Sequence, residues 1–494
     1  MVPVGRWLLA LGGGVVWGVC FGREPLLVAP WLALIPLLFL LGQPRAWLLG
    51  WAHGLAFWLT SIPWIAPTLV SYGQLPTWLA GLSLLALASY LALFSGLFAA
   101  LGARIWRSGG WPALLGLPAL WVVTEWLRGH LFGGFPWNLA AYSWLEVPGA
   151  LPLAAWLGAF GISYLVLFAN TGLALAMATR RWRMGALAVG LCLLLLPVAG
   201  RWVMASVAKS TVGPTVAVRV LQPNIGVLTE WDAERVEENY HRVLRMSSQA
   251  CEASEPLLLW PESAVWPYSY SRDEGVQRDL AALTGKGCTV LLNTSISADE
   301  GAYNSVILVG ENGVEGRYDK RHLVPFGEFV PMADRLPFLK KIARQAGSFL
   351  AGDSVALLGW SQQQLGTAIC FEVTFPEEVA EQVREGATIL VTVTNDAWYG
   401  DSWAPWQHYR AARFRAAESQ RYLLRAAITG VSAIIRPDGS EEQRLDVGEE
   451  GVLGGRVSGL NGLSLYSRWP WIVPIVCMVV AAFAIFLSRR GSSL

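Results

Sequence analysis

The hydrophobic positions divide the chain into membrane-like parts at both ends and a polar part between them. Long apolar runs fill residues 1–211 and return in 456–494, and each is near the length that spans a bilayer as a helix. No small-residue cleavage site follows the first run, so we interpret it as a retained helix rather than a signal peptide. The pattern predicts a polytopic helical membrane domain and a C-terminal membrane helix, with helices at about 5–22, 25–42, 45–65, 77–103, 111–128, 151–179, 184–205 and 470–488.

Residues 212–455 have a different pattern, in which short β-branched runs alternate with helical stretches. Strands are predicted at 216–221, 257–260, 289–292, 305–309 and 388–393, and a hairpin-like pair at 426–428 and 431–435. Helices are predicted at 230–250, 272–284, 376–385 and 406–424. This alternation is typical of a layered α/β domain, although periodicity alone does not distinguish a doubly wound sheet from other α/β sheets.

The composition supports a membrane protein and argues against several other classes. Of the 494 residues, 54% are hydrophobic and 15% are charged, whereas soluble proteins carry about 25% charged residues. A net charge of +1 argues against nucleic acid as the main partner. The six cysteines contain no C-x-x-C pair and the five histidines no H-E-x-x-H motif. We therefore expect neither a disulfide framework nor a metal site, and no cofactor.

The basic residues of the short loops predict the orientation of the membrane helices. With the N-terminus in the cytoplasm, most of the arginines in 1–211 and in the C-terminal tail lie on the inner side. Seven helices before the polar region then place 212–455 outside the cytoplasm. In a bacterium this is the periplasmic face of the inner membrane. An even number of helices would reverse that conclusion.

The strongest chemical signal is a cysteine at a junction between a strand and a helix. The apolar run 365–369 leads directly into Cys370, and a helix start follows, whose partial positive charge favours a thiolate. Glu262 follows the strand at 257–260 and, in apolar surroundings, is the candidate general base. Lys320 is the candidate for stabilising an oxyanion. Glu328 is placed to orient Lys320 or to relay a proton.

Each of these residues alone has a simpler interpretation. A single cysteine in an apolar run is more often an inert core residue, and a strand-end glutamate or a loop lysine is more often a surface charge. Their joint order favours catalysis, because four motifs occur together: W-P-E at 260–262, K-x-x-L-V-P-F-G-E at 320–328, C-F-E at 370–372 and T-N-D-A-W at 394–398. These motifs resemble the nitrilase, or carbon–nitrogen hydrolase, superfamily. With the membrane region in front of them, the chain resembles the apolipoprotein N-acyltransferase branch.

The resemblance implies an α-β-β-α sandwich for 212–455 and roles for named residues. The implied catalytic triad is Glu262, Lys320 and Cys370, with Glu328 and Glu372 in support. Phe371 stands where tyrosine is common in this family, and Ile428 where asparagine is often found. The F-P-W segment that ends at residue 137 is either an interfacial aromatic belt or a re-entrant loop that lines a lipid-access cleft. Residues expected to contact substrate are Trp137, Trp231, Asn304 and Phe371.

The resemblance also implies a function. Cys370 would take an acyl chain from a phospholipid, which we expect to be phosphatidylethanolamine, and hold it as a thioester. The free N-terminal amine of an S-diacylglyceryl-cysteine on an apolipoprotein would then accept the chain. Apolar segments around 231 and 326–350 would act as lids on the membrane face. The alternatives are a membrane-tethered amidase for a small soluble substrate and a transporter with a regulatory domain. The spans carry few charged residues and no visible inverted repeat, which argues against the transporter.

Overall fold

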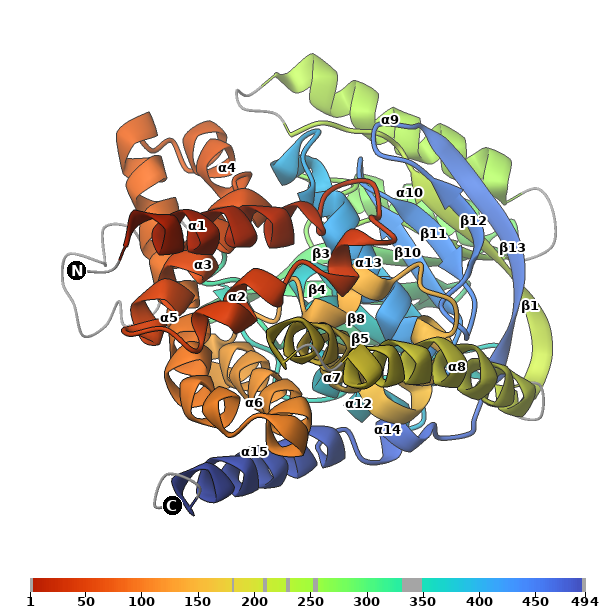
Figure 1. The fold of residues 1–494 in the computed structure, drawn as a ribbon. Coiled ribbons are helices and arrows are strands. Elements are labelled where there is room, and N and C mark those ends of the chain that lie inside the picture. Colours follow the sequence, from red (N-terminus) through yellow and green to blue (C-terminus); the bar gives the residue numbers. More distant parts are fainter. Residues whose placement is uncertain are drawn as a thin grey trace. The chain divides into compact units, whose positions relative to one another are not determined.

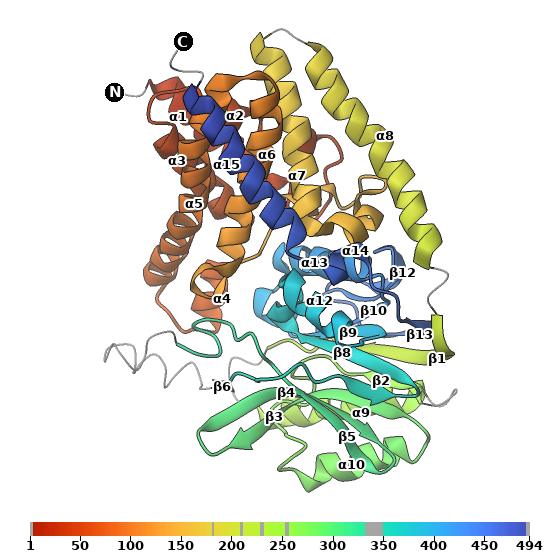
Figure 2. The same cartoon turned by 90° about the horizontal axis from the view of Figure 1, so that it is seen from below.

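The protein is described from a computed structural model of the full chain, which describes residues 3–179, 182–207, 211–227, 232–251, 256–330 and 349–490. The chain forms two compact units. One comprises residues 1–205 together with 469–494, and the other comprises 206–468. Figures 1 and 2 show the elements of both units in sequence colours. Each unit is described by itself below.

The first unit is helical throughout its described residues. Many of its large apolar side chains are exposed along α5, α8 and α15, which is what a lipid environment favours, because lipid does not penalise exposed apolar surface. The helices are α1 (Val4–Val19), α2 (Ile35–Leu40), α3 (Ala46–Ser61), α4 (Ile65–Ser71), α5 (Thr77–Ser108), α6 (Gly110–His130), α7 (Ala150–Thr179), α8 (Trp182–Val207) and α15 (Ile472–Arg490).

The predicted spanning helix at 25–42 is wrong. This segment contains a short 3-10 turn, Ala29–Trp31, and the six-residue α2, because prolines at 30 and 36 interrupt a continuous helix. Asn170 of α7 satisfies backbone groups at the break. Its side chain donates to the carbonyl of Pro30 at 2.9 Å and accepts from the N–H of Leu34 at 3.1 Å. A buried amide therefore replaces hydrogen bonds that a continuous helix would have made internally.

The structure supports fewer membrane spans than the expected eight. Among the described residues, four helices are long and apolar enough to cross a membrane: α5, α7, α8 and α15. The number rises to five if α3 and α4, which meet at 51°, are one bent span. Helix α1 has 16 residues, whereas a straight span needs about 20. Three or four of these spans precede the second unit, so their number does not decide its side of the membrane.

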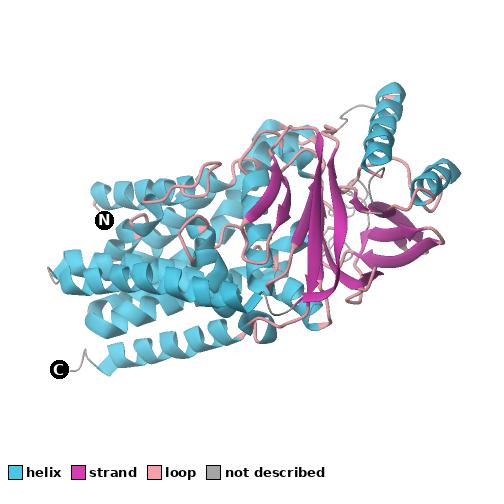
Figure 3. Cartoon of the chain, turned by 90° about the vertical axis from the view of Figure 1, so that its right-hand side faces the viewer, coloured by secondary structure: helices cyan, strands magenta, loops and turns pink. Residues whose placement is uncertain are grey.

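The second unit contains two sheets, drawn in magenta in Figure 3. The strand order is β13-β1-β2-β3-β4-β5 in the first sheet, where β6 also pairs with β4, and β12-β11-β10-β9-β8-β7 in the second. In each sheet, three parallel strands are flanked by antiparallel ones. The strands are β1 (Thr211–Gln222), β2 (Leu257–Leu259), β3 (Thr289–Ala298), β4 (Gly301–Gly310), β5 (Gly313–Asp319), β6 (Phe349–Leu350), β7 (Leu358–Trp360), β8 (Gln363–Ile369), β9 (Ile389–Thr394), β10 (Leu423–Ala427), β11 (Ser432–Ile435), β12 (Glu441–Leu445) and β13 (Gly451–Leu460).

Helices cover the outer face of each sheet, so the unit has four layers. Leu257 and Leu259 of β2 pack between the two sheets, whereas Leu258 packs beneath α9 (Ala233–Ala250) and α10 (Glu274–Thr284). The second sheet repeats this alternation, with Val391 in the layer between the sheets and Leu390 beneath α12 (Pro376–Arg384) and α13 (Ala404–Ser419). The α-β-β-α sandwich implied by the resemblance is confirmed.

Several element boundaries differ from the predicted ones. The helix predicted at 406–424 ends at Ser419, because Gln420 adopts a left-handed conformation with φ 51°. Leu423 instead begins β10 and pairs with Leu390 of β9. Strands β5, β12 and β13 were not predicted, since their many glycines and charged residues hide the alternation. The predicted hairpin-like pair is confirmed as β10 and β11.

The expectation of no disulfide is wrong for one pair of cysteines. Cys251 and Cys288 are bonded, with their Cα atoms 5.7 Å apart and 37 positions apart in the sequence. Cys251 follows the last turn of α9, and Cys288 immediately precedes β3. The bond therefore ties an outer helix to the sheet that it covers. Cysteine spacing in a single sequence does not reveal such a contact, because the fold brings the two residues together.

Removing this disulfide should destabilise the second unit. A cross-link that closes a loop of this size stabilises a fold by about 2–4 kcal/mol. We expect the Cys251→Ser, Cys288→Ser double variant to unfold several degrees below the wild-type protein in a thermal scan. A reductant should lower the wild-type transition to the same temperature and leave the double variant unchanged. A wild-type transition that is insensitive to reductant would contradict the bond, as would alkylation of all six cysteines without reduction.

Candidate active site

Cys370 lies at a sharp turn where β8 ends. The parallel strands β8 and β9 stop at Ile369 and Thr394, and ligand sites in α/β folds form at the carboxyl ends of such strands. Cys370 has a φ of 51°, a left-handed conformation that is uncommon for residues other than glycine. It then begins a 3-10 turn, Cys370–Thr374. A strand, a strained turn and a helical turn in this order present a nucleophile at the end of a sheet.

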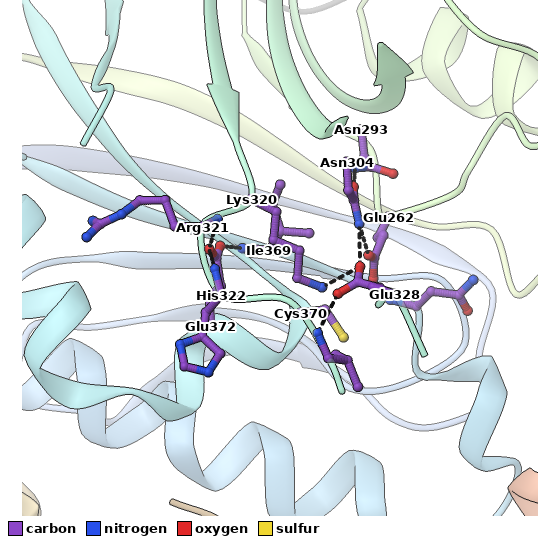
Figure 4. A network of polar contacts seen from close by, with 12 residues as sticks. Glu262, Asn293, Asn304, Lys320, Arg321, His322, Glu328, Ile369, Cys370 and Glu372 are labelled. Atoms are coloured by element: carbon purple, nitrogen blue, oxygen red, sulfur yellow. Dashed lines mark hydrogen bonds and ion pairs between the residues drawn. The ribbon is translucent and has the colours of Figure 1, made fainter. Parts of the chain in front are cut away.

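The first sheet contributes the charged groups that Cys370 faces (Figure 4). Lys320, directly after β5, donates from Nζ to Glu328 Oε1 at 2.8 Å. Asn304 of β4 donates from Nδ2 both to Glu262 Oε1, at 3.1 Å, and to Glu328 Oε1, at 3.0 Å. Figure 4 shows the Lys320 amine directed toward Glu328, and Cys370 is near enough to Glu262 and Lys320 for both charges to affect the pKa of its thiol. The predicted residues Glu262, Lys320, Glu328 and Cys370 therefore form one cluster, in which the side chain of Glu328 is 13% exposed and the other three residues are buried.

Further hydrogen bonds fix the two carboxylates. The second oxygen of Glu262 accepts from the N–H of Asn395 at 2.9 Å, and Asn395 immediately follows β9. The second oxygen of Glu328 accepts from the N–H of Val324 at 2.8 Å. The Glu262 carboxylate thus bridges the two sheets, because Asn304 belongs to the first sheet and Asn395 follows the second.

Burial and mutual charge set the protonation states of the cluster. Burial and the nearby Glu262 raise the pKa of the Cys370 thiol, although Lys320 lowers it. Burial raises the pKa of Glu262 as well, against the opposite effect of Lys320. Burial disfavours charge on Lys320, but Glu328, Glu262 and Cys370 outweigh this effect, so the pKa of Lys320 is raised. Cys370 is thus a thiol at rest. Burial of the thiol is the largest cause of this shift, so the short 3-10 turn after Cys370 does not make it a thiolate.

Glu372 fastens the cysteine turn to the segment that carries Lys320. One of its carboxylate oxygens accepts from the N–H of Ile369 at 2.7 Å. The other accepts from the N–H groups of Arg321 and His322, at 2.7 and 3.1 Å, and from the hydroxyl of Tyr318. Burial raises the pKa of Glu372 to about 7, although the hydrogen bond from Ile369 opposes the shift. Its contacts are with the scaffold of the site, and it is a positioning residue.

A second buried network supports the cysteine turn from behind. His408 of α13 lies with Nε2 2.9 Å from the carbonyl oxygen of Cys370. Its Nδ1 lies 3.1 Å from Asp396 Oδ1 and 3.2 Å from Arg425 Nη2, and Arg425 pairs with the other oxygen of Asp396 at 2.7 Å. Sequence analysis assigned no role to these three residues, although Asp396 lies in the T-N-D-A-W motif. The available signal was the arginine inside the apolar strand at 423–427, since a buried charge requires a partner.

The other predicted residues have different surroundings. Phe371 is buried and packs edge-on against Phe375, with ring centroids 5.0 Å apart. Asn304 contacts the two carboxylates, so in this structure it bridges protein groups. Trp137 belongs to the first unit, where it is 4% exposed and packs against Trp64 at 5.4 Å. Trp231 lies outside the described residues, as do 331–348 of the proposed lids.

The arrangement is suited to covalent acyl transfer. A thiol, a carboxylate base and a buried cation converge at one point, which is the set that nucleophilic catalysis at a carbonyl carbon requires. The base can deprotonate the thiol, and the cation can stabilise the oxygen that becomes negative after attack. Within the described ranges, no group of three or more His, Cys, Asp or Glu side chains is arranged to hold a metal ion.

Two family models match this chain. Residues 13–172 match the apolipoprotein N-acyltransferase N-terminal domain, and residues 215–458 match the carbon–nitrogen hydrolase domain. Among solved structures, part of the chain is similar to the Saccharomyces cerevisiae protein Nit3, a member of branch 10 of the nitrilase superfamily. That similarity has 16% identity and a TM-score of 0.39, and it covers 52% of this chain and 94% of Nit3.

Curated relatives match over nearly their whole length. An apolipoprotein N-acyltransferase of Geobacter metallireducens is 35% identical over 515 residues, which covers 100% of this chain and 97% of the relative. Proteins of the same name from Methylococcus capsulatus and Pseudomonas syringae pv. tomato are 35% and 32% identical, and the alignments cover 97% and 99% of those chains. The resemblance inferred from the motifs is confirmed.

Removing the charge of Lys320 should shift the ionisation of the cysteine to higher pH. Lys320 lowers the pKa of both Cys370 and Glu262, so its loss raises both. We expect Lys320→Met to move the pH profile of iodoacetamide alkylation at Cys370 upward, and to slow alkylation at pH 7 by about tenfold or more. Lys286→Met, at an exposed lysine on a different part of the unit, is the control. A profile that stays in place or moves to lower pH would contradict the assigned role of Lys320.

Proposed function

Because this chain belongs to the apolipoprotein N-acyltransferase family, we propose that it is a membrane-bound acyltransferase that N-acylates apolipoproteins through a thioester on Cys370. The observation that carries the proposal is the buried cluster of Glu262, Lys320 and Cys370, in a chain that also has helices long and apolar enough to cross a membrane. The acyl donor is a membrane phospholipid, which we expect to be phosphatidylethanolamine. The acceptor is the N-terminal amine of an S-diacylglyceryl-cysteine.

In the first half-reaction, Glu262 takes the thiol proton as Cys370 Sγ attacks the ester carbonyl carbon of the phospholipid. The raised pKa of Glu262 makes it a stronger base than an exposed carboxylate. The carbonyl oxygen becomes an oxyanion beside the Lys320 ammonium, which stays protonated because its pKa is raised. When the tetrahedral intermediate collapses, the C–O bond breaks, the lysophospholipid leaves as an alcohol with the proton from Glu262, and a thioester remains.

In the second half-reaction, the acceptor amine attacks the thioester carbonyl carbon. Glu262 takes a proton from the attacking nitrogen, and Lys320 stabilises the new oxyanion. The C–S bond then breaks, the Cys370 sulfur regains its proton, and an amide is released. Glu328 holds the Lys320 ammonium through the 2.8 Å hydrogen bond, while Asn304 keeps the two carboxylates in place. This sequence of steps needs no metal or cofactor.

A phospholipid donor is consistent with the chain's membrane helices. A hydrolase of small amides gains nothing from spans such as α5 and α7, whereas a donor and an acceptor that both reside in the bilayer must be reached from it. The same reasoning supports a bacterial inner-membrane location. The alternative amidase is retained as an outcome of the experiment below.

The Cys251–Cys288 disulfide supports a periplasmic position for the second unit, because disulfides are favoured in an oxidising compartment and rare in the cytosol. The arginines of the loops add no second argument, because the sides of those loops were assigned with a spanning helix at 25–42 that the structure does not contain. Cys370 is free and buried, which protects it from oxidation in the same compartment.

The proposal predicts a covalent intermediate. Purified protein incubated with phosphatidylethanolamine in detergent, without acceptor, should gain the mass of one acyl chain on Cys370. Hydroxylamine should remove it, because a thioester is labile to this nucleophile. Cys370→Ala should form no adduct. Glu262→Gln should form it about 10²–10⁴-fold more slowly, because the general base is lost. Glu311→Gln, at an exposed glutamate in a turn, is the matched control and should react at the wild-type rate.

The absence of an adduct from wild-type protein, together with ammonia release from small amides, would overturn the proposal in favour of the tethered amidase. An adduct that forms at the wild-type rate in Glu262→Gln would instead reject only the assigned base.

His322 is expected to be dispensable for acyl transfer although it lies two residues from Lys320. Its Nδ1 pairs with Glu378 at 2.8 Å, and its ring stacks on Phe375 with centroids 3.6 Å apart. The ring therefore points into the region beside α12. We expect His322→Ala to form the adduct within about threefold of the wild-type rate, since changes outside the reacting groups cost little. An inactive but folded His322→Ala protein would mean that the proton path is assigned incorrectly.

A further inference from the structure

The carbonyl of the nucleophile itself has a buried side-chain partner. His408 is 1% exposed, and its Nε2 lies 2.9 Å from the oxygen of Cys370. A carbonyl oxygen only accepts hydrogen bonds, so Nε2 must carry a proton and donate it. Among the described residues, the only cis peptide bond is Trp266–Pro267, and the Cys370–Phe371 peptide is therefore trans.

The second ring nitrogen lies between a donor and an acceptor. Arg425 Nη2, which can only donate, lies 3.2 Å from Nδ1. Asp396 Oδ1 lies 3.1 Å from Nδ1 and can accept from it, while it also accepts from the hydroxyl of Thr394 at 2.9 Å, and Oδ2 accepts from Arg425. Burial and Arg425 lower the pKa of His408, although Asp396 opposes the shift. Whichever of these partners Nδ1 takes, the contact with Cys370 requires a proton on Nε2.

Holding this carbonyl also determines where the adjacent N–H points. In a trans peptide the C=O and N–H bonds point in opposite directions. His408 approaches from α13, which covers the outer face of the second sheet. The Phe371 N–H consequently points away from α13, toward the side from which the first sheet supplies Glu262 and Lys320. A hydrogen bond to the carbonyl also polarises the peptide and makes its N–H a stronger donor.

We propose that His408, held by Asp396 and Arg425, is a positioning residue that aligns and polarises the Cys370–Phe371 peptide, so that the Phe371 N–H joins Lys320 in binding the oxyanion. This inference rests on the proposed acyl transfer and adds a group that stabilises the transition state without touching the substrate. His408 transfers no proton in this role, because both nitrogens of its ring contact protein groups.

Two amide substitutions separate the two nitrogens of the ring. In His408→Gln the side-chain N–H₂ reaches the position of Nε2 and can still donate to Cys370. In His408→Asn the shorter amide reaches only the position of Nδ1. We expect His408→Asn to lower the rate of acylation by about 10- to 100-fold, less than the loss of an oxyanion donor itself, with KM unchanged. We expect His408→Gln to restore most of that loss.

A second reaction of the same sulfur distinguishes positioning of the oxyanion from a general disturbance of the turn. Acylation by a p-nitrophenyl ester builds an oxyanion, whereas alkylation by iodoacetamide does not. We expect His408→Asn to slow the p-nitrophenol burst and to leave the alkylation rate within about threefold of wild type. A parallel loss of both reactions would overturn the proposal, and so would a His408→Gln protein no faster than His408→Asn.

The ester probe also separates this inference from the proposed function. A wild-type protein that reacts with the p-nitrophenyl ester but not with phospholipid would contradict the lipid donor, while the comparison of His408 variants would still decide the role of the peptide.

A measurement on the wild-type protein covers the case in which the variants do not fold. In protein labelled with ¹⁵N in its histidines, we expect the His408 imidazole at pH 7 to be protonated on Nε2. Its signal is identified as the buried one that persists in His53→Gln, because His53 is the other buried histidine of the described residues. A ring protonated on Nδ1 alone would overturn the proposal, because Nε2 could then not donate to Cys370.

Discussion

The active site of the second unit depends on several ionisable side chains that are packed against one another and largely excluded from solvent. An isolated buried charge is costly, so each member of the cluster needs the others. Lys320 compensates two carboxylates, Asn304 supplies hydrogens to both, and Cys370 stays neutral until a base acts on it. The opposite charges that lower the cost of burial also set the reactivity of Cys370, because they determine whether the thiol or the base holds the proton.

The residues of this cluster lie at the ends of strands from both sheets of the sandwich. Glu262 and Lys320 come from the first sheet, while Cys370 and Asn395 follow strands of the second, so the site is complete only when the two sheets pack. Glu372 and His408 both hold the turn. Glu372 links the N–H of Ile369 to the Lys320 segment, and His408 binds the carbonyl of Cys370. Two sets of buried polar contacts, those of Glu372 and those of His408, therefore fix the position of the reactive sulfur.

Much of this site was predictable from the sequence, and the reasons are physical. Glu262, Lys320 and Cys370 each follow a strand, so local pattern and motif order were sufficient to group them. His408 and Arg425 could not be placed in this way, because they lie within α13 and β10 and neither follows a strand end. The Cys251–Cys288 bond was not predicted because cysteine spacing does not reveal which helix packs on which strand. In the first unit, composition indicated helices correctly. It did not reveal that prolines at 30 and 36 break one of them, or that α3 and α4 meet at 51°.

The position of β13 has a consequence for how the protein is made. This strand, residues 451–460, pairs along β1, which begins at residue 211, and the whole second sheet is encoded between them. Until β13 has been synthesised, one edge of β1 has no neighbour in the sheet, and unpaired edges invite pairing with other chains. A ribosome that stalls before Gly451 would thus leave a chain that contains every catalytic residue and yet has an open, aggregation-prone first sheet. The first sheet is therefore complete only after residue 460 has been synthesised.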